Sequence, residues 1–540
     1  LPAELVAVCE RAMRQDITER FASAEALAAD VVAWLDGVRR RELALAALDQ
    51  ARALDPEIAA LRQCATEASA RARALAAELR SFDPIEAKRP MWSLEEEAAR
   101  LGRAAAIAET RWMEAVQGAL NLDPDLPEGH ALLADHHRQQ LVEAERSRRD
   151  DDAARAEAML RSHDRGRHAG FLRGDGALTL VTDPPGAEVW VDRYAVHDRR
   201  LVPVPEGLLG VTPLVELRLA RGSYLLRLRA PGRAEVRYPV LIERAGHWDG
   251  RAPGEPEPYP IVLPADGELG AEDCYVPAGW CWTGGTPGAA ECLATSRVWV
   301  DGFVIRRFPI TNAEYLGFLN ELVATGRDAE ALAACPRAQT TMPQAVDELV
   351  FSRDGAGRFG LTGVPGDSAG QPWQPRWPVV LIDWYAANAY ARWLAGRTGQ
   401  PWRLPNEIER EKAARGADGR HYPWGDQFDA TWACVLDSYP GEATRVGVDA
   451  YALDDSACGA RGLAGNVRDW CENVWTHDGP STQGPRLRVA LSSRDDAALR
   501  AIRGGAWGSP GELSRAEARF ASRPGARWKT TGFRLARGLR

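Results

Sequence analysis

The sequence predicts a multidomain α+β protein, because three stretches of different pattern follow one another along its 540 residues. Residues 38–168 consist almost entirely of helix formers, chiefly Ala, Arg, Glu and Leu. Residues 173–264 alternate apolar with polar side chains between Pro and Gly, which is typical of a small antiparallel β-domain. Residues 268–540 combine amphipathic helices and short strands with loops rich in Trp and Gly. Each stretch is long enough to form a domain of its own.

Composition narrows the class of protein. The net charge of −9 argues against nucleic-acid binding, and no apolar run approaches the roughly 18 residues of a membrane span. The nine cysteines are scattered and form no CxxC, which indicates reduced thiols in a cytoplasmic protein. Because the first residue is Leu rather than Met, we expect the chain to be part of a longer protein.

Residues 1–37 predict two helices, the second capped near Ser23 and ending at Gly37. This stretch resembles the last helices of bacterial serine/threonine protein kinases, in which an arginine, here Arg20, anchors the lobe just before the final helix. The Gly-rich loop, the strand lysine and the HRD and DFG sequences of a kinase are absent. We therefore expect no phosphoryl transfer from this chain itself.

The helical region predicts two helical blocks, about 40–80 and 93–122, separated by the Pro-containing turn SFDPIEAKRP. The segment ALNLDPDLPEGHALLADHH resembles the helix–turn–helix junction of a tetratricopeptide repeat. One junction is fewer than the roughly three repeats that a solenoid requires. A helical spacer or hairpin is therefore favoured over a peptide-binding groove.

The predicted β-domain contains PPGAEVWVD, then GVTPL, then RGSYLLRL. This order resembles the PEGA module, a small β-sandwich: Pro185, Gly186 and Ala187 match its opening, and Thr212 with Pro213 matches its middle. The resemblance implies a spacer or interaction domain without chemistry of its own. The following segment, AGHWDGRAPGEPEPYP, predicts a linker.

The C-terminal region carries six motifs in order: PITNAEY, RLPNEIEREKAARG, YPWGD, GLAGNVRDW, RGGAW and GFRLAR. They resemble the motifs of the formylglycine-generating-enzyme superfamily, which are close to PVTNxxY, RLPTEAEWE, YPWG, GNVWEW, RGGSW and GFR. The resemblance implies an irregular C-type-lectin-like fold with buried aromatic residues.

Local patterns in this region predict its first elements. An alternating strand begins at Val298, and Thr311 or Asn312 can cap the helix that follows. That helix would bury Tyr315, Phe318 and Leu319. The run VVLIDWYAANAYARWLAGRTG predicts a buried strand and a second amphipathic helix.

The enzymes of this superfamily use two cysteines after RGGSW, five positions apart, to hold the Cu(I) that activates oxygen. The matching positions here are Ser509 and, within one residue of alignment, Ser514. Cu(I) prefers soft thiolates, whereas a serine hydroxyl is hard and stays protonated at neutral pH. No cysteine lies beyond Cys471. We therefore expect neither copper nor oxidase activity of the parent type.

The resemblance also raises the question of two other metals, iron and calcium. Ergothioneine-type iron oxygenases carry a similar domain, and their iron ligands come from a His-rich helical domain. The helical region here offers His130, His136, His137, His163 and His168. The adjacent His136 and His137 stand beside a run of Arg and Gln, which favours surface decoration over an iron triad.

The superfamily also binds structural Ca²⁺ in the loop that matches GNVRDW. The resemblance implies the carbonyls of Gly465 and Val467 and the carboxylate of Asp469 as ligands. Calcium needs about six oxygen ligands. Gly462 replaces the expected acidic or amide residue, and Asp469 is shorter than the usual Glu. Any calcium here would be structural.

We expect the C-terminal domain to act as a module that binds an unknown protein or small-molecule ligand. Loops on a rigid scaffold commonly carry recognition, and aromatic and Arg side chains are common anchors. Arg503 and Arg534 are instead expected to anchor the RGG and GFR turns through hydrogen bonds to carbonyls. The predicted binding face lies on the segment 508–531 and its border, with the candidates Trp507, Ser509, Glu512, Ser514, Arg515, Glu517, Arg519, Arg527 and Trp528.

The predicted domain order resembles bifunctional bacterial proteins that join a kinase to a formylglycine-generating-enzyme-like domain. This resemblance implies a sensory or recruiting role for a kinase domain upstream in the same polypeptide. The segment between RGGAW and GFR also corresponds to the variable region of retroelement-diversified proteins with this fold. The alternative interpretation is a metal-dependent oxidoreductase of the formylglycine-generating or non-heme iron type.

Overall fold

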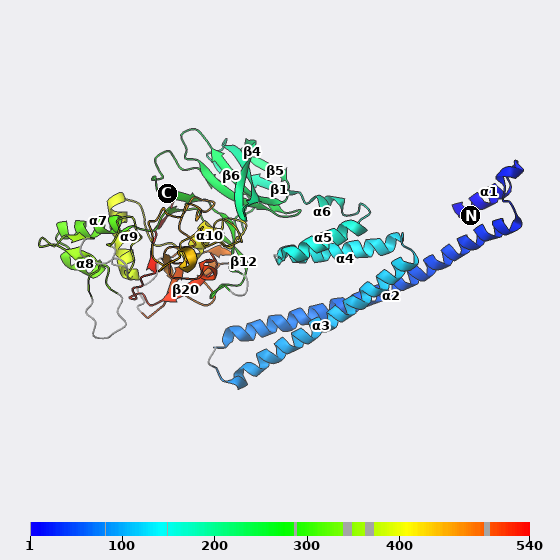
Figure 1. The fold of residues 1–540 in the computed structure, drawn as a ribbon, viewed down its shortest axis with the longest axis horizontal. Coiled ribbons are helices and arrows are strands. Elements are labelled where there is room, and N and C mark those ends of the chain that lie inside the picture. The colour runs from blue at the N-terminus through cyan, green and yellow to red at the C-terminus, as the bar shows by residue number, and fades with distance from the viewer. Residues whose placement is uncertain are drawn as a thin grey trace. The chain divides into compact units, whose positions relative to one another are not determined.

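The computed structural model describes residues 2–80, 83–147, 149–285, 289–338, 348–361, 372–490 and 497–539. The chain forms two compact units, Leu1–Arg173 and Gly174–Arg540 (Figure 1). In the described residues the first unit is helical, and every strand belongs to the second. This agrees with the predicted multidomain layout of helices and strands. None of the described helices combines the length and the apolar character that crossing a membrane requires.

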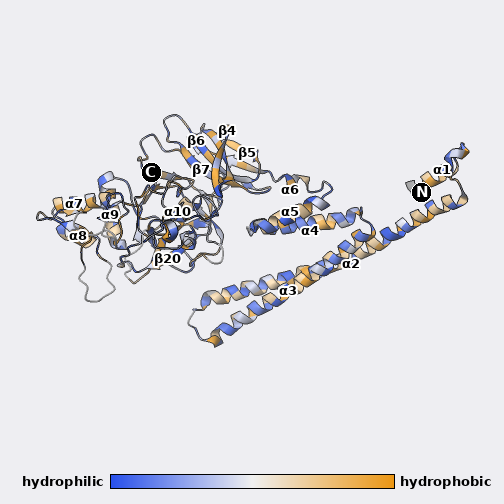
Figure 2. Ribbon diagram, in the orientation of Figure 1, coloured by the Kyte–Doolittle hydropathy of each residue, from blue (hydrophilic) through white to orange (hydrophobic). Residues whose placement is uncertain are grey.

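Two long helices form the main hairpin of the first unit. Helix α2 (Ala24–Glu78) packs along α3 (Ile85–Leu122), and their shared core includes Leu48, Trp112 and Val116. Hydrophilic and hydrophobic residues alternate along both helices, as expected for helices that bury one stripe each (Figure 2). The short helix α1 (Ala3–Ala12) precedes them.

The helix boundaries confirm one end signal and contradict another. Ser23 caps α2, because its side chain accepts a hydrogen bond from the amide of Ala26. The predicted stop at Gly37 is wrong, since α2 continues through this glycine and ends only at Glu78. A terminating glycine adopts a left-handed backbone, but Gly37 is not among the positive-φ glycines. Strong helix formers follow it, so the helix continues.

The rest of this unit confirms the predicted helix–turn–helix junction. Four residues separate the end of α3 from helix α4 (Pro127–Arg146), which has Pro in its first turn. Helix α5 (Asp150–His163) packs on α4 around Leu141 and Leu160, and α6 (Ala169–Arg173) follows. That this region is a helical spacer or hairpin rather than a peptide-binding groove stays a prediction.

Arg173 ends helix α6 of the first unit, and the strands of the predicted small β-domain lie between Gly176 and Val262. Its main sheet is antiparallel in the order β4-β3-β6-β7, and a second sheet has the order β5-β1-β8. Pairs β1–β8 and β2–β9 are parallel. The strands are β1 (Gly176–Leu180), β2 (Thr182–Asp183), β3 (Glu188–His197), β4 (Arg200–Val211), β5 (Leu214–Leu219), β6 (Gly222–Arg229), β7 (Val236–Ile242), β8 (His247–Trp248) and β9 (Ile261–Val262).

The β-domain is joined to the C-terminal domain by direct contacts within the second unit. The amide of Leu201 in β4 donates to the carbonyl of Trp424 at 2.8 Å. The Ser223 hydroxyl donates to Asp418 at 2.6 Å. Apolar side chains of both domains share one buried core, in which Val240 and Tyr315 take part. The two domains are thus packed together rather than only linked.

The described residues of the C-terminal domain form four small sheets and four α-helices, separated by long loops. Sheet orders are β10-β13-β22, β11-β12-β18-β17 and β20-β19-β16-β21, and β14 pairs with β15. The elements are β10 (Asp273–Val276), β11 (Gly279–Thr283), β12 (Ser296–Val300), β13 (Phe303–Arg306), α7 (Asn312–Ala324), α8 (Asp328–Ala334), β14 (Ser352–Arg353), β15 (Phe359–Gly360), α9 (Trp384–Thr398), α10 (Glu407–Arg415), β16 (Arg468–Val474), β17 (Thr482–Gln483), β18 (Arg486–Leu487), β19 (Arg500–Arg503), β20 (Arg519–Ser522), β21 (Thr531–Gly532) and β22 (Ala536–Gly538).

Helix α7 confirms the predicted start and the predicted buried face. Thr311 is its N-cap and forms a capping box with Glu314. Tyr315, Phe318 and Leu319 are all buried in the main core. The aromatic rings pack edge to face, with Tyr315 and Phe318 centroids 5.4 Å apart.

The strand predicted in VVLI is wrong. Residues 379–382 are buried but belong to no sheet. The amide of Val379 donates to the Ile310 carbonyl and that of Leu381 to the Trp528 carbonyl. Leu381 also has a positive φ of 61°. An apolar run predicts burial, but here loops rather than a neighbouring strand satisfy its backbone groups.

Helix α10 lies in the interior although most of its residues are charged. Arg410 and Arg534, both fully buried, donate to the same oxygen of Asp469 at 3.0 Å and 2.8 Å. The buried Asp469 carboxylate therefore joins α10, the start of β16 and the GFR turn. A buried charge is tolerated only when it is paired and hydrogen-bonded.

A second buried group of charges joins α10 to the strands β19 and β20. Glu411 accepts hydrogen bonds from Arg415 at 2.7 Å and from Arg503. Glu407 accepts two from Arg519, at 2.7 Å and 2.9 Å. All five side chains are nearly or fully buried. Opposite charges from distant parts of the sequence thus hold the helix against the sheet.

We predict that Glu411→Ala strongly destabilises the second unit. The substitution leaves the buried guanidinium groups of Arg415 and Arg503 without this carboxylate, which typically costs about 3–5 kcal/mol. Urea unfolding of the full chain, followed by tryptophan fluorescence, measures the loss. As a matched control, Glu330→Ala removes the exposed partner of Arg327 and should leave the free energy of unfolding unchanged. Equal effects of the two substitutions would contradict the structural role of the buried network.

Candidate functional site

The two serines at the cysteine positions are buried and are not joined to each other. Ser509 is 5% exposed, and its hydroxyl oxygen accepts a hydrogen bond from Nη2 of Arg468 at 2.8 Å. Ser514, at the end of a short 3₁₀ helix (Gly511–Ser514), is fully buried. Among the described atoms its hydroxyl has no hydrogen-bond partner, so no hydrogen bond connects the two serines. This arrangement offers two hydroxyls in separate surroundings.

Ser514 lies directly beneath the backbone of the RGG turn. A Cβ atom added at Gly505 would lie 2.1 Å from the Ser514 hydroxyl oxygen and 2.1 Å from the carbonyl oxygen of Ala464. Only glycine therefore fits at position 505. The close packing leaves the Ser514 hydroxyl inaccessible to a ligand in this conformation.

Arg468 is the unexpected member of the site. It is the first residue of β16 and stands where the superfamily motif GNVWEW has Trp. Its guanidinium lies over the Phe520 ring, 4.0 Å from the centroid. Burial lowers the pKa of Arg468 to about 10, and no carboxylate of the described chain forms an ion pair with it. The cation next to Ser509 therefore lacks a counterion within the described residues.

The sequence contained a signal for Arg468, the replacement of Trp by Arg within GNVRDW, but it was not among the predicted site residues. The charge alone predicts a solvated surface arginine. Only the structure shows that the side chain is half-buried and reaches Ser509, 41 positions later.

Part of the predicted binding face is accessible. Glu512 and Trp528 are exposed, the latter by 41%, and Trp507, Arg515 and Arg527 are half-buried. Several of these side chains are held in place: the Trp507 indole donates to the Lys529 carbonyl at 3.2 Å, the Trp528 indole to the Ser522 hydroxyl at 2.9 Å, and Arg527 to Asp383 at 2.7 Å.

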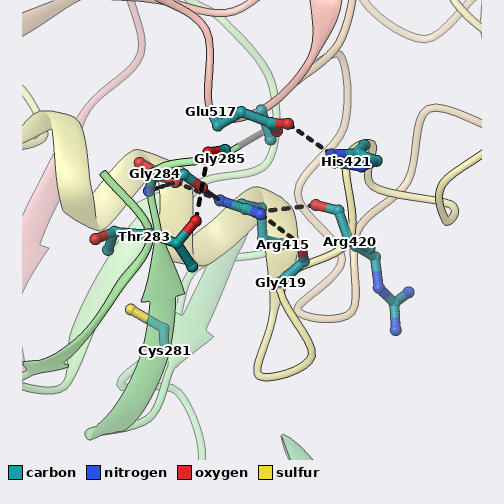
Figure 3. Close-up of polar contacts among 12 residues, drawn as sticks. Cys281, Thr283, Gly284, Gly285, Arg415, Gly419, Arg420, His421 and Glu517 are labelled. Carbon is teal, nitrogen blue, oxygen red and sulfur yellow. Dashed lines mark hydrogen bonds and ion pairs between the residues drawn. The ribbon is translucent and has the colours of Figure 1, made fainter. Parts of the chain in front are cut away.

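Two predicted face residues, Glu517 and Arg519, lie inside the domain. Glu517 is fully buried and contacts Nδ1 of His421 at 2.5 Å (Figure 3). Burial opposes ionisation of Glu517, but the hydrogen bond from His421 and the nearby Arg415 lower its pKa below the ordinary value. Arg519 is 1% exposed and paired with Glu407. Neither side chain can contact a ligand in this conformation, and their role is structural.

The same interior region holds the Arg415 guanidinium in a ring of carbonyls. It donates to the carbonyls of Gly284, Gly419 and Arg420 at 2.5–2.9 Å (Figure 3). Gly285 lies against the Glu517 side chain, since a Cβ atom there would be 2.5 Å from Glu517 Cγ. Glu517 belongs to the segment between RGG and GFR, and this part of the segment is therefore packed in the core.

Arg503 and Arg534 confirm the prediction that they anchor turns. Arg503 donates to the Glu517 carbonyl at 3.1 Å, and Arg534 donates to the Gly462 carbonyl at 2.8 Å. The sequence did not predict their carboxylate partners, of which Asp469 is one. Those partners lie far away in the sequence and cannot be assigned from local spacing.

The predicted calcium ligands have other partners in the structure. One oxygen of Asp469 accepts from two guanidinium groups, and the Gly465 carbonyl accepts from the amide of Val467 at 2.9 Å. The loop is held by Asp454, whose carboxylate accepts from the amide of Gly465 at 3.1 Å and from the two amides before it. Both arginines contact Oδ2 of Asp469, whereas Oδ1 is buried without a hydrogen-bond partner among the described residues. Two cations at this carboxylate disfavour a third, and the calcium site stays an untested prediction.

The histidines of the helical unit are not surface decoration, so that interpretation of the pair is wrong. His137 is 6% exposed, and the half-buried His136 packs against Trp112 in a tilted arrangement with ring centroids 4.9 Å apart. Burial lowers the pKa of His136. Nδ1 of His130 lies 3.0 Å from Nδ1 of His163. Hydrophobic helix faces cover these rings. The Arg and Gln residues that neighbour them along the chain did not indicate this burial. Within the described residues no group of three or more side chains could hold a metal ion.

Comparison with known proteins places the second unit in a family. Residues 263–539 match the family model of the sulfatase-modifying factor enzyme 1-like domain. Because this match covers half of the chain, the chain belongs to that family. The result agrees with the superfamily that the ordered motifs indicated.

The chain is similar to several characterised relatives. It is 27% identical over 270 residues to the serine/threonine-protein kinase Pkn1 of Chlamydia trachomatis, covering 50% of this chain and 38% of the kinase. It is 32% identical over 251 residues to the hercynine oxygenase of Mycolicibacterium thermoresistibile, covering 44% and 51%. It is 33% identical over 181 residues to the formylglycine-generating enzyme of Thermomonospora curvata, covering 30% and 56%. The chain thus spans well under two thirds of each of these proteins.

Among solved structures, the chain is similar to PvdO from Pseudomonas aeruginosa. That likeness has 25% identity and a TM-score of 0.38, and covers 49% of this chain and 94% of PvdO.

We predict that calcium does not stabilise the second unit, because two arginines already neutralise Asp469. Thermal unfolding of the full chain should give the same melting temperature in EDTA and in millimolar CaCl₂, with MgCl₂ as the control for ionic strength. A calcium-specific rise that disappears in Asp469→Asn would show instead that this loop binds the ion.

Proposed function

We propose that this chain is the C-terminal recognition region of a bacterial serine/threonine kinase that acts in the cytoplasm. In this proposal the formylglycine-generating-enzyme-like domain binds a ligand and does not oxidise it. Membership of the sulfatase-modifying factor family and the likeness to the Pkn1 kinases support the proposal. The kinase domain itself would lie upstream in the same polypeptide.

One observation carries the non-catalytic part of the proposal. The first cysteine position holds Ser509, whose hydroxyl accepts a hydrogen bond from the Arg468 guanidinium. Cu(I) requires soft, anionic sulfur ligands. A neutral hydroxyl beside a fixed cation supplies the opposite surroundings, and the second position, Ser514, is sealed under the RGG turn. The residues present therefore do not fit copper, and we assign no oxidation step to them.

The accessible part of the predicted face is the proposed binding surface. Aromatic and Arg side chains contribute most of the binding energy in many interfaces, particularly when their rotamers are held in advance. Hydrogen bonds hold both indoles in place, and an ion pair to Asp383 holds one arginine. The surface comprises Trp507, Glu512, Arg515, Arg527 and Trp528, and its ligand would be a protein or a small molecule.

We predict that the purified chain does not convert a Cys-x-Pro-x-Arg peptide to its aldehyde. The assay supplies Cu(I) and oxygen and follows the peptide mass, because oxidation replaces the thiol with an aldehyde. A formylglycine-generating enzyme serves as the positive control in the same buffer. Turnover by this chain would refute the binding-module proposal and favour the alternative, a metal-dependent oxidoreductase.

A further inference from the structure

Arg468 contrasts with several buried arginines of the domain that pair with a carboxylate. Arg410 and Arg534 share Asp469, and Arg519 is paired with Glu407. No such pair is found for Arg468 in the described residues, although its side chain is half-buried. Burying a charge without a counterion is costly, so a half-buried guanidinium without a carboxylate at the start of β16 marks a place where a ligand can supply the charge.

The hydrogen-bond geometry leaves donors available beside Arg468. Nη2 donates to the Ser509 oxygen, which therefore keeps its own hydroxyl hydrogen free to donate onward. The Arg468 Nε group has no hydrogen-bond partner in the described structure, but it is buried and out of reach of a ligand. The two Nη groups of a guanidinium form a planar fork that matches two oxygens of a carboxylate or phosphate. The Nη groups of Arg468 and the Ser509 hydroxyl can thus offer converging donors to one oxyanion.

The neighbouring residues hold this donor group in place and add a second cation. Phe520 supports the flat face of the guanidinium, and the Arg468 amide donates to the Thr530 carbonyl at 2.9 Å. Lys529, which directly precedes Thr530, is exposed, and its ammonium lies 5.2 Å from the Trp507 ring centroid. Trp507 is two residues before Ser509. The backbone segments that carry these two cations and the aromatic ring are therefore neighbours, since the Trp507 amide also donates to the Asn466 carbonyl at 2.9 Å.

We propose that Arg468 and Ser509 form a binding site for an oxyanion group, a carboxylate or a phosphate, of a ligand whose apolar or aromatic body contacts Trp507. This proposal rests on the proposed binding function and names the chemistry of the ligand. The guanidinium and the serine hydroxyl hold the two oxygens, and Lys529 favours the negative charge. Arg468 replaces the family's Trp at the position where a cation can reach Ser509.

Titration calorimetry of the full chain with two aromatic anions tests the site. Phenyl phosphate and benzoate represent the phosphate and the carboxylate, and benzyl alcohol is the neutral control, all at constant ionic strength. Wild-type protein should bind at least one anion and should not bind the alcohol measurably. Which anion binds more tightly distinguishes a phosphorylated ligand from a carboxylate ligand.

Variants locate the binding. Arg468→Gln should weaken anion binding about tenfold or more, since hydrogen bonds to charged groups contribute roughly 1.5–3 kcal/mol. Ser509→Ala should weaken it by a smaller factor. Arg523→Gln, which removes an exposed positive charge from the same segment, is the matched control and should leave the affinity unchanged. Far-UV circular dichroism confirms that each variant is folded.

Two results would overturn the site: no binding of either anion by the wild type, or equal affinities in wild type and Arg468→Gln. The peptide oxidation assay is independent of this outcome. Failure of anion binding without peptide oxidation removes the oxyanion site and leaves the binding module. Anion binding together with peptide oxidation removes the binding-module proposal and leaves the site.

Discussion

The pairing of buried charges around α10 is the constraint on which the rest of the C-terminal domain depends. Each charge needs an opposite charge or several carbonyls in the interior, because leaving it unpaired there costs several kcal/mol. The charges of α10 pair with residues of β16, β19 and β20, and the GFR turn joins the same network through Asp469. Pairing therefore fixes where these elements lie. The segment with both serines runs between β19 and β20. All six charged residues of the helix are buried, namely Glu407, Glu409, Arg410, Glu411, Lys412 and Arg415.

This constraint also explains which features the sequence could predict. Local signals sufficed for the Thr311 cap and the buried face with Tyr315, because capping and periodicity act within a few residues. The burial of Arg519 could not be predicted, since its partner Glu407 is 112 positions away and an isolated charge indicates solvent. The predicted stop at Gly37 failed because glycine alone does not end a helix surrounded by helix formers. Long-range pairing is the missing information.

The fold and the candidate site depend on different residues. Ion pairs and packed glycines in the interior hold the scaffold, whereas Trp507 and Arg468 are only half-buried and the buried Ser509 is bonded to Arg468. Changing surface residues need not disturb the interior, and the same scaffold can therefore present different chemistry. In our proposal, a hydroxyl at the position where the superfamily has a thiolate, together with the cation beside it, supplies donors suited to an anion rather than ligands for a soft metal.

Competition for Cu(I) between the chain and a chromophoric chelator tests the central claim most directly. The measurement compares the wild type with the double variant Ser509→Ala, Ser514→Ala, in which the exposed thiols of Cys9 and Cys64 are unchanged. If the serines have replaced the metal site, both proteins withdraw the same amount of copper from the chelator. If the wild type binds one more equivalent than the double variant, the serines support a copper site and the account is wrong.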